Sequence, residues 1–180
     1  LFEAPFELDA KKAFQLSRSS AARELAREAA RQSIVLLRND NQFLPLDLGK
    51  YEKIAVIGPN AKFCRLGNYS GRPIKSISVL DGIRQFVGDS AKVVYAEGSK
   101  IAENDTGDSY SNWRYVNEVE FSSLESNRPL IEEAKRVAAE SDLIVLAIGE
   151  NVLLSREAWG GNHVGDRSTL DLTESQKVLA

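Results

Sequence analysis

The sequence predicts an α/β fold in which helices cover both faces of a mostly parallel sheet. Three short apolar runs, at residues 53–58, 92–96 and 143–148, have the composition and length of buried strands, and a glycine follows each closely or ends it. Helical patterns alternate with these runs, as in parallel strands joined by crossover helices. We expect a truncated three-layer α/β/α sandwich, because the last helix has scarcely begun at Ala180.

The first helix is expected to begin at Ser20, capped by Ser19 or by Ser20 itself, and to stop at residues 39–41. Residues 1–18 mix Pro5 with alternating charges and are expected to be irregular. The helix is predicted from small and apolar side chains at helical spacing: Ala22, Leu25, Ala26, Ala29, Ser33, Leu36 and Leu37.

The run at residues 53–58 is almost entirely apolar, which indicates a strand covered on both faces. Residues 58–78 are rich in Gly, Asn, Ser and Pro, and we expect a long loop there. Residues 79–87 follow as a helix, capped by Ser76 or Ser78 and closed by Gly88.

After the strand at residues 92–96, residues 98–127 are polar, and a stretch of that length is typical of a functional segment or an insertion. Asn127 is expected to cap the next helix, with Pro129 in its first turn. The third strand then spans residues 143–148.

Residues 150–172 form a second long polar loop after the third strand. Thr173, followed three residues later by Gln176, has the pattern of a capping box that starts the last helix.

Composition excludes several classes of function. The net charge is −3 and no basic patch is visible, so a nucleic-acid partner is not expected. No apolar run approaches the roughly 18–20 residues that cross a bilayer, so no membrane span is expected. Cys64 is the single cysteine, which excludes an internal disulfide.

Candidate chemistry lies in the loops after Gly58 and Gly149, because ligands of open α/β sheets bind beyond the carboxyl ends of the strands. A carboxylate in such a loop can act as a general acid if it is placed beside the scissile bond. Trp159 offers an aromatic face that can pack against a sugar ring. The second loop carries Glu150, Glu157, Trp159, His163, Asp166 and Arg167.

Less specific interpretations compete with this one. Arg156 beside Glu157 can be an ordinary surface ion pair. Residues 58–61 follow a strand, but Asn60 stands where a dinucleotide fingerprint needs its second glycine. His163 with the carboxylates of Glu150, Glu157 and Asp166 lacks the spacing of a metal site, so we expect neither a metal nor a cofactor.

Several segments together resemble family 3 glycoside hydrolases. The first spans Ala26–Asp40 and is followed by Leu44-Pro45-Leu46, as in the segment that leaves the catalytic barrel of that family. The second is Lys53–Ala61 with residues 66–71, which resembles the first strand and loop of the family's second domain, and residues 76–82 continue the match. Ser141–Glu150, Ser155–Trp159 and Gly165–Ser168 complete it.

The resemblance implies that residues 1–50 form the barrel exit and linker, and that residues 51–180 form the first part of the α/β sandwich domain. The (β/α)8 barrel, with its nucleophilic Asp, is then absent from this chain and would be its partner in the same protein. Family members place the acid/base Glu in a Ser-Gly-Glu setting, and Ser155-Arg156-Glu157 matches it with Arg for Gly. Glu157 is therefore the predicted acid/base.

Glu150 is the second candidate for that role, and Trp159 and His163 are predicted to bind substrate. Asp166 and Arg167 would brace the loop. The implied activity is a retaining, exo-acting β-glycosidase, a β-glucosidase first and a β-xylosidase second, acting on an oligosaccharide or glycoside. Periplasmic or secreted localisation is expected.

Two alternatives stay open from the residues: a noncatalytic carbohydrate-binding or interaction module of the same fold, and a nucleotide-binding α/β domain. By itself the segment is expected to be inactive, because no acidic residue in it matches the nucleophile motif. It is also expected to self-associate, through apolar faces that would otherwise meet the barrel and further strands.

Overall fold

A computed structural model describes residues 9–66, 75–107, 119–155 and 167–180. The chain divides into two compact units, residues 1–46 and residues 47–180.

The first unit contains helices α1 (Ala10–Ser17) and α2 (Ser20–Ser33). Helix α1 corrects the expectation of an irregular start: the Asp9 side chain accepts a hydrogen bond from the backbone N–H of Lys12 and caps a run of good helix formers. Helix α2 is capped by Ser19, as predicted, but it ends at Ser33 rather than continuing to residue 38. Ile34 already has extended backbone angles, and two consecutive β-branched residues there disfavour the helix.

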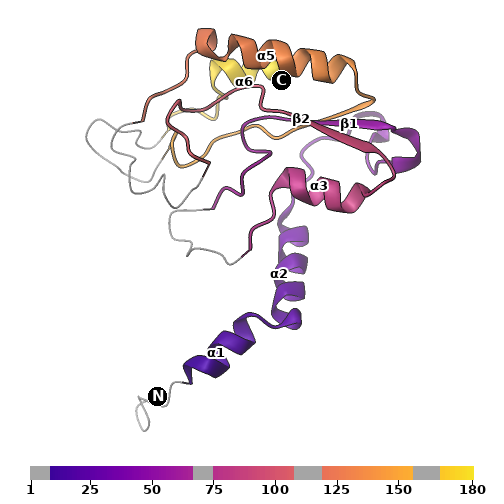
Figure 1. Cartoon of the computed structure of the whole chain (residues 1–180), viewed down its shortest axis with the longest axis vertical. Coiled ribbons are helices and arrows are strands. Elements are labelled where there is room, and N and C mark those ends of the chain that lie inside the picture. The colour runs from indigo at the N-terminus through magenta and orange to yellow at the C-terminus, as the bar shows by residue number, and fades with distance from the viewer. Residues whose placement is uncertain (1–8, 67–74, 108–118, 156–166) are drawn as a thin grey trace. The chain divides into compact units, whose positions relative to one another are not determined.

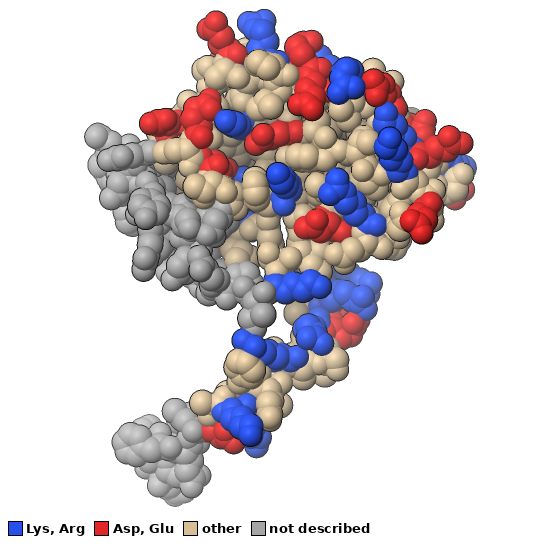
Figure 2. Space-filling model, viewed as in Figure 1, with Lys and Arg blue, Asp and Glu red and all other residues tan. Residues whose placement is uncertain are grey.

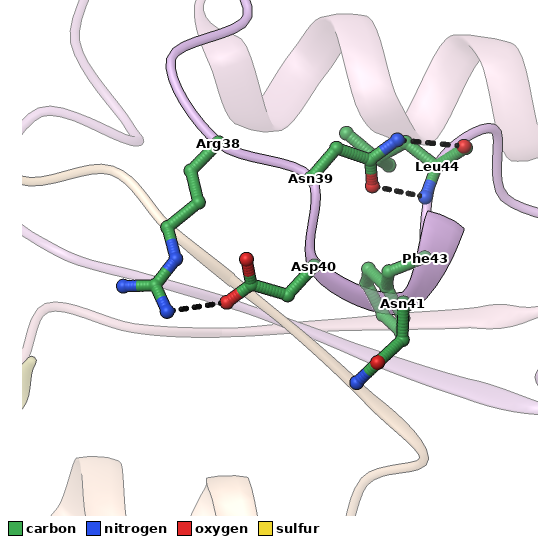
Figure 3. Close-up of a pocket in the computed structure, with 6 residues that line it drawn as sticks. All are labelled: Arg38, Asn39, Asp40, Asn41, Phe43 and Leu44. Carbon is green, nitrogen blue, oxygen red and sulfur yellow. Dashed lines mark hydrogen bonds and ion pairs between the residues drawn. The ribbon is translucent and has the colours of Figure 1, made fainter.

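A turn at residues 38–44 closes this unit (Figure 3). The side chain of Asn39 accepts a hydrogen bond from the N–H of Leu44 at 2.8 Å and donates one to its carbonyl at 3.0 Å. Arg38 forms an ion pair with Asp40 beside it. These contacts lie on an open hollow whose lining includes Asn41 and Phe43.

The second unit is built on a three-stranded parallel sheet, as predicted. Its strands are β1 (Lys53–Ile57), β2 (Lys92–Ala96) and β3 (Leu143–Leu146), in the spatial order β2-β1-β3. Ile57 at the end of β1 is in register with Ala96 on one side and with Leu146 on the other. All three carboxyl ends therefore meet at one edge.

Helices cover both faces of this sheet and make three layers (Figure 1). On one face, Leu80 of α3 (Val79–Val87) packs in a cluster with Val56. On the other, Ala134 of α5 (Leu124–Ala139) packs with Ala55 and Ile57, beside the short helix α6 (Glu174–Leu179). The alternation of side chains along β1 thus fills both cores, as the apolar run indicated.

The start of α5 corrects a prediction. The cap is Ser123, whose hydroxyl accepts from the N–H of Ser126, so the helix begins one turn before Asn127. Asn127 lies inside the helix and is 1% exposed. Its amide is free to bind elsewhere because Ser123 already serves the helix end.

The edge of the sheet formed by β3 is apolar and open. Ile144 of β3 is 46% exposed and Val178 of α6 is 48% exposed, and both line a shallow groove. Elsewhere on the face shown in Figure 2, acidic and basic side chains are intermingled over the second unit. Among the described residues, no helix is both long enough and apolar enough to cross a membrane.

Candidate functional site

The connections of β1 and β3 leave the sheet in opposite directions. The chain after β1 leads to α3 on one face, and the chain after β3 leads to α6 on the other. Because β1 and β3 are neighbours, the strand order reverses between them, and ligands of open α/β sheets bind at such a point. Both loops that the sequence singled out start here.

The two strand ends touch closely. Gly58 has a φ of +130°, and a Cβ atom on it would lie 2.4 Å from the carbonyl oxygen of Ala147. Asn60 then donates its backbone N–H to that same carbonyl at 3.1 Å. Glycine is needed at position 58 because any side chain would push β3 away from β1.

The side chain of Asn60 crosses the reversal point. Its Nδ2 donates to the carbonyl of Gly149 at 3.2 Å, while its Oδ1 is buried and accepts no hydrogen bond within the described part of the chain. The loop after β1 is thereby tied to the first residues of the loop after β3.

Gln176 holds the same residue from the other side. Its Oε1 accepts the N–H of Gly149 at 2.7 Å, and its Nε2 donates to the carbonyl of Gly149 at 3.1 Å. We call this pair of bonds the Gln176 clamp; the side chain is 1% exposed. The capping box predicted with Thr173 is only half present, since Thr173 accepts from the backbone of Gln176 while the amide serves Gly149.

Sequence reasoning missed this role of Gln176. The spacing that indicates a capping box does not distinguish a side chain that turns back to its own helix from one that reaches into the sheet. The available signal was chemical: Gln176 is an uncharged amide close to the start of a helix that follows a polar loop.

Glu150, the second candidate acid, has both carboxylate oxygens engaged. Oε2 accepts from the hydroxyl of Ser155 at 3.0 Å, and Oε1 pairs with Nε of Arg167 at 3.1 Å. Arg167 in turn donates to the carbonyl of Asp171 at 2.7 Å. Glu150 therefore joins the beginning and the end of the loop, and its carboxylate is engaged by a cation and a hydroxyl.

The other predicted site residues, Glu157, Trp159, His163 and Asp166, lie outside the described residues, and so does Arg156. Their roles stay predictions. The described flanks show that the segment carrying them is held at Ser155 on one side and at Arg167 on the other, both through Glu150.

The end of β2 has a second set of polar contacts. Asn127 of α5 accepts the N–H of Lys100 at 2.8 Å and donates to the carbonyl of Lys100 at 3.1 Å. The same Nδ2 lies 3.0 Å from the hydroxyl of Ser175. We call this arrangement the Asn127 clamp.

A part-buried ion pair joins the loops after β1 and β2. The guanidinium of Arg65 contacts both carboxylate oxygens of Asp105, at 3.1 and 2.7 Å, and also donates to the carbonyl of Pro59. The Asp105 side chain is 9% exposed and also accepts the N–H of Gly107. A bidentate pair of this kind fixes the two loops rather than presenting a free charge.

Two groups near the end of β2 titrate away from their ordinary values. Burial raises the pKa of Glu97, and this effect exceeds the opposing influence of Lys100. Burial also raises the pKa of Tyr95 to about 12, with Glu97 adding to the shift. In the described ranges, no group of three or more His, Cys, Asp and Glu side chains is placed to hold a metal ion.

Comparison with known proteins agrees with this architecture. The glycosyl hydrolase family 3 C-terminal domain model matches residues 34–180. A β-xylosidase from Formosa agariphila is 39% identical over 87% of the chain, and a periplasmic β-glucosidase from Salmonella typhimurium is 36% identical over 87%. The chain spans 19% and 20%, respectively, of the lengths of these relatives.

A solved structure of a β-glucosidase from Erythrobacter marinus superposes on 98% of this chain with a TM-score of 0.82 at 33% identity. The chain covers 24% of that protein. No (β/α)8 barrel is present among the described residues. The chain belongs to glycosyl hydrolase family 3 and carries the fold of that family's C-terminal α/β domain.

Proposed function

We propose that this chain is the part of a retaining, exo-acting β-glycosidase that supplies the general acid/base, Glu157. The whole enzyme would hydrolyse terminal β-D-glucosyl residues, or β-D-xylosyl residues, of an oligosaccharide or glycoside. The relatives support both sugars, because they include enzymes named as β-glucosidases and as β-xylosidases. A barrel domain of the same protein would supply the nucleophilic Asp.

The observation that carries the proposal is the anchoring of the loop that contains Glu157. The loop starts at the reversal point between β1 and β3, and its two ends are joined through Glu150. A general acid must stay within hydrogen-bond reach of the leaving oxygen, so a loop with fixed ends at a ligand-binding edge suits that role.

The chemistry follows from retention of configuration. The barrel Asp would attack the anomeric carbon and form a covalent glycosyl-enzyme, while Glu157 protonates the departing oxygen. Glu157 would then act as base and take a proton from the water that releases the sugar. No cofactor enters either step.

Glu150 suits bracing better than proton transfer. An acid must present a protonated oxygen to the substrate, whereas both oxygens of Glu150 are occupied by Ser155 and Arg167. We therefore assign Glu150 to holding the loop, and we keep Trp159 and His163 as proposed substrate contacts.

The test uses the longer protein that contains this chain and a barrel. Glu157→Ala should lower kcat/KM about 10²- to 10⁴-fold for an aryl β-glycoside with a poor leaving group, and much less for the 2,4-dinitrophenyl glycoside, which departs without a proton. Azide should partly restore turnover of the dinitrophenyl substrate by replacing the water that needs a base. Glu157→Gln serves as the isosteric control.

Glu150→Gln is the matched comparison within the same loop. It should lower kcat/KM less than Glu157→Ala does, and more for the poor leaving group than for the dinitrophenyl glycoside, because it loosens the loop without removing the acid. A loss confined to the poor leaving group in Glu150→Gln, with near-normal Glu157→Ala, would move the acid/base role to Glu150.

We further propose that the enzyme acts in the periplasm or outside the cell, because one relative is a periplasmic β-glucosidase. The 180-residue segment alone should not hydrolyse aryl glycosides, because the nucleophile lies elsewhere. It should also self-associate through the open edge formed by β3 and α6. Activity of the purified segment, or a monodisperse monomer in light scattering, would contradict these two expectations.

A further inference from the structure

The Gln176 clamp grips the residue at which the loop after β3 begins. Both backbone groups of Gly149 are satisfied by one side chain, and the carbonyl also receives Asn60. The next residue, Glu150, is gripped by Arg167. Gly149 and Glu150, at the start of this loop, are thus held by Gln176 and Arg167, which come after Glu157 in the sequence.

We infer that Gln176 is a positioning residue for the general acid/base, acting through the backbone of Gly149. This inference rests on the proposed role of Glu157. Gln176 is too far buried to meet substrate directly, at 1% exposure, so it would act by fixing where the loop leaves the sheet. It is not a catalytic residue in its own right.

The physical reason is geometric. Gly149 has a φ of +131°, a conformation that its own residue type allows but does not enforce. The reciprocal amide bonds and the bond from Asn60 select that conformation. A change of direction at the start of a loop shifts the residues that follow it directly, and a displacement of about 1 Å at a reacting group can cost on the order of 10²-fold in rate.

A displaced acid has a signature that general destabilisation lacks. Only the step that needs a proton on the leaving oxygen should slow, because the barrel nucleophile is untouched. The value of kcat/KM reports that first step alone. A phenyl glycoside should therefore be affected strongly, and a 2,4-dinitrophenyl glycoside should be affected little.

The experiment is Gln176→Met in the longer, barrel-containing protein, a substitution that keeps side-chain length and removes both bonds to Gly149. We expect kcat/KM for the phenyl glycoside to fall roughly 10- to 100-fold, and kcat/KM for the dinitrophenyl glycoside to fall less than about 3-fold. The sugar is glucose or xylose, whichever the wild type hydrolyses faster.

Asn127→Leu is the matched control, because Asn127 makes the same pair of bonds to Lys100 in the loop after β2 and is equally buried. Ser175→Ala accounts for the additional bond that Asn127 makes to α6. Both controls leave the bonds to Gly149 intact, so their leaving-group difference should be smaller than that of Gln176→Met. A small difference is expected for Asn127→Leu, because Ile101 and Ala102 beside Lys100 pack with Leu153 and Leu154 of the loop after β3.

If Gln176→Met does not fold, Gln176→Glu replaces it. Protonated glutamic acid can accept from the N–H of Gly149 and donate to its carbonyl as glutamine does, whereas the carboxylate cannot donate. The leaving-group difference should therefore be large at neutral pH and shrink as the pH falls.

Three results decide the matter. A leaving-group-dependent loss in both Glu157→Ala and a Gln176 variant supports the inference. The same loss in Glu157→Ala, with a uniform loss in the Gln176 variants, overturns the inference and leaves the proposed function standing. No leaving-group dependence in Glu157→Ala overturns both.

Discussion

The ends of β2 and β3 use the same device for different loops. At β2, Asn127 pairs with the backbone of Lys100, and at β3, Gln176 pairs with the backbone of Gly149. Each amide is 1% exposed and lies on a helix of the same layer, and Asn127 also reaches Ser175, the neighbour of Gln176.

The two clamps differ in what surrounds them. The residue held by Gln176 also meets Asn60 across the reversal point of the strand order, and the chain continues into a loop whose ends are joined through Glu150. The residue held by Asn127 leads toward the Arg65–Asp105 pair. The β3 end thus combines a clamp with a brace at the expected ligand edge, whereas the β2 end meets the loop after β3 through the apolar cluster of Ile101, Ala102, Leu153 and Leu154.

The largest contrast is expected between Gly58, which follows β1 and contacts the backbone after β3, and Gly98, which follows β2. Gly58→Ala should lower the free energy of unfolding by ~3–4 kcal/mol, because the new Cβ would lie 2.4 Å from the backbone of Ala147 at a φ of +130°. Gly98→Ala should cost only ~1–2 kcal/mol, because its φ is +69° and the contacting atoms belong to the movable side chains of Leu179 and Ile57. Urea unfolding of the barrel-containing protein measures both. Equal losses would contradict the claim that Gly58 lies too close to the backbone of Ala147 to accept a side chain.

Amide hydrogen exchange separates the two clamps. Gln176→Met should speed exchange at Gly149 about 10-fold while leaving Lys100 protected, and Asn127→Leu should do the reverse, since each lost bond is worth ~1–1.5 kcal/mol. Peptide-level mass spectrometry resolves the two positions. Faster exchange at both sites in either variant would mean that α5 and α6 move as one unit.

The smallest effect concerns Glu97 near the β2 end. Burial raises its pKa in the folded state, so the folded protein binds a proton more readily than the unfolded chain does. Stability from this group is then fully present below the ordinary pKa near 4.5 and is lost as the pH rises through the raised value. Glu97→Gln should therefore raise Tm at pH 7 and give no gain at pH 4. A gain of equal size at both pH values would show that the carboxylate is not penalised by burial.

The sheet was predictable from sequence because each strand is marked by a short apolar run and each flanking helix by residues close to its own ends. Residues 53–57 are apolar on both faces, and the flanking helix at residues 79–87 starts at a Ser cap and ends at Gly88, as expected. The missed helix α1 and the early end of α2 lie in the first unit, where the described residues include no buried side chain of either helix. Amphipathic pattern is a weak guide there, because local capping and propensity decide the boundaries.

The clamps could not be predicted from sequence for a related reason. Asn127 and Gln176 each have the residue type and spacing of a helix cap, and in both cases a hydroxyl residue, Ser123 or Thr173, does the capping instead. Whether an amide turns to its own helix or to a distant loop depends on tertiary packing. The hydrogen bond from Asn60 to Gly149 could not be predicted from spacing, because the two residues are 89 positions apart. The ion pair between Glu150 and Arg167 was also missed, because the sequence indicated different roles for these two residues.

The most direct test of the account is a double-mutant cycle between Glu157→Ala and Gln176→Met, measured as kcat/KM for a phenyl glycoside. If Gln176 acts by placing Glu157, the second substitution should add almost nothing once the acid is gone, and the two effects should be strongly non-additive. Full additivity of the two losses would show that Gln176 contributes only to the stability of the fold. It would contradict the claim that Gln176 positions the acid through Gly149.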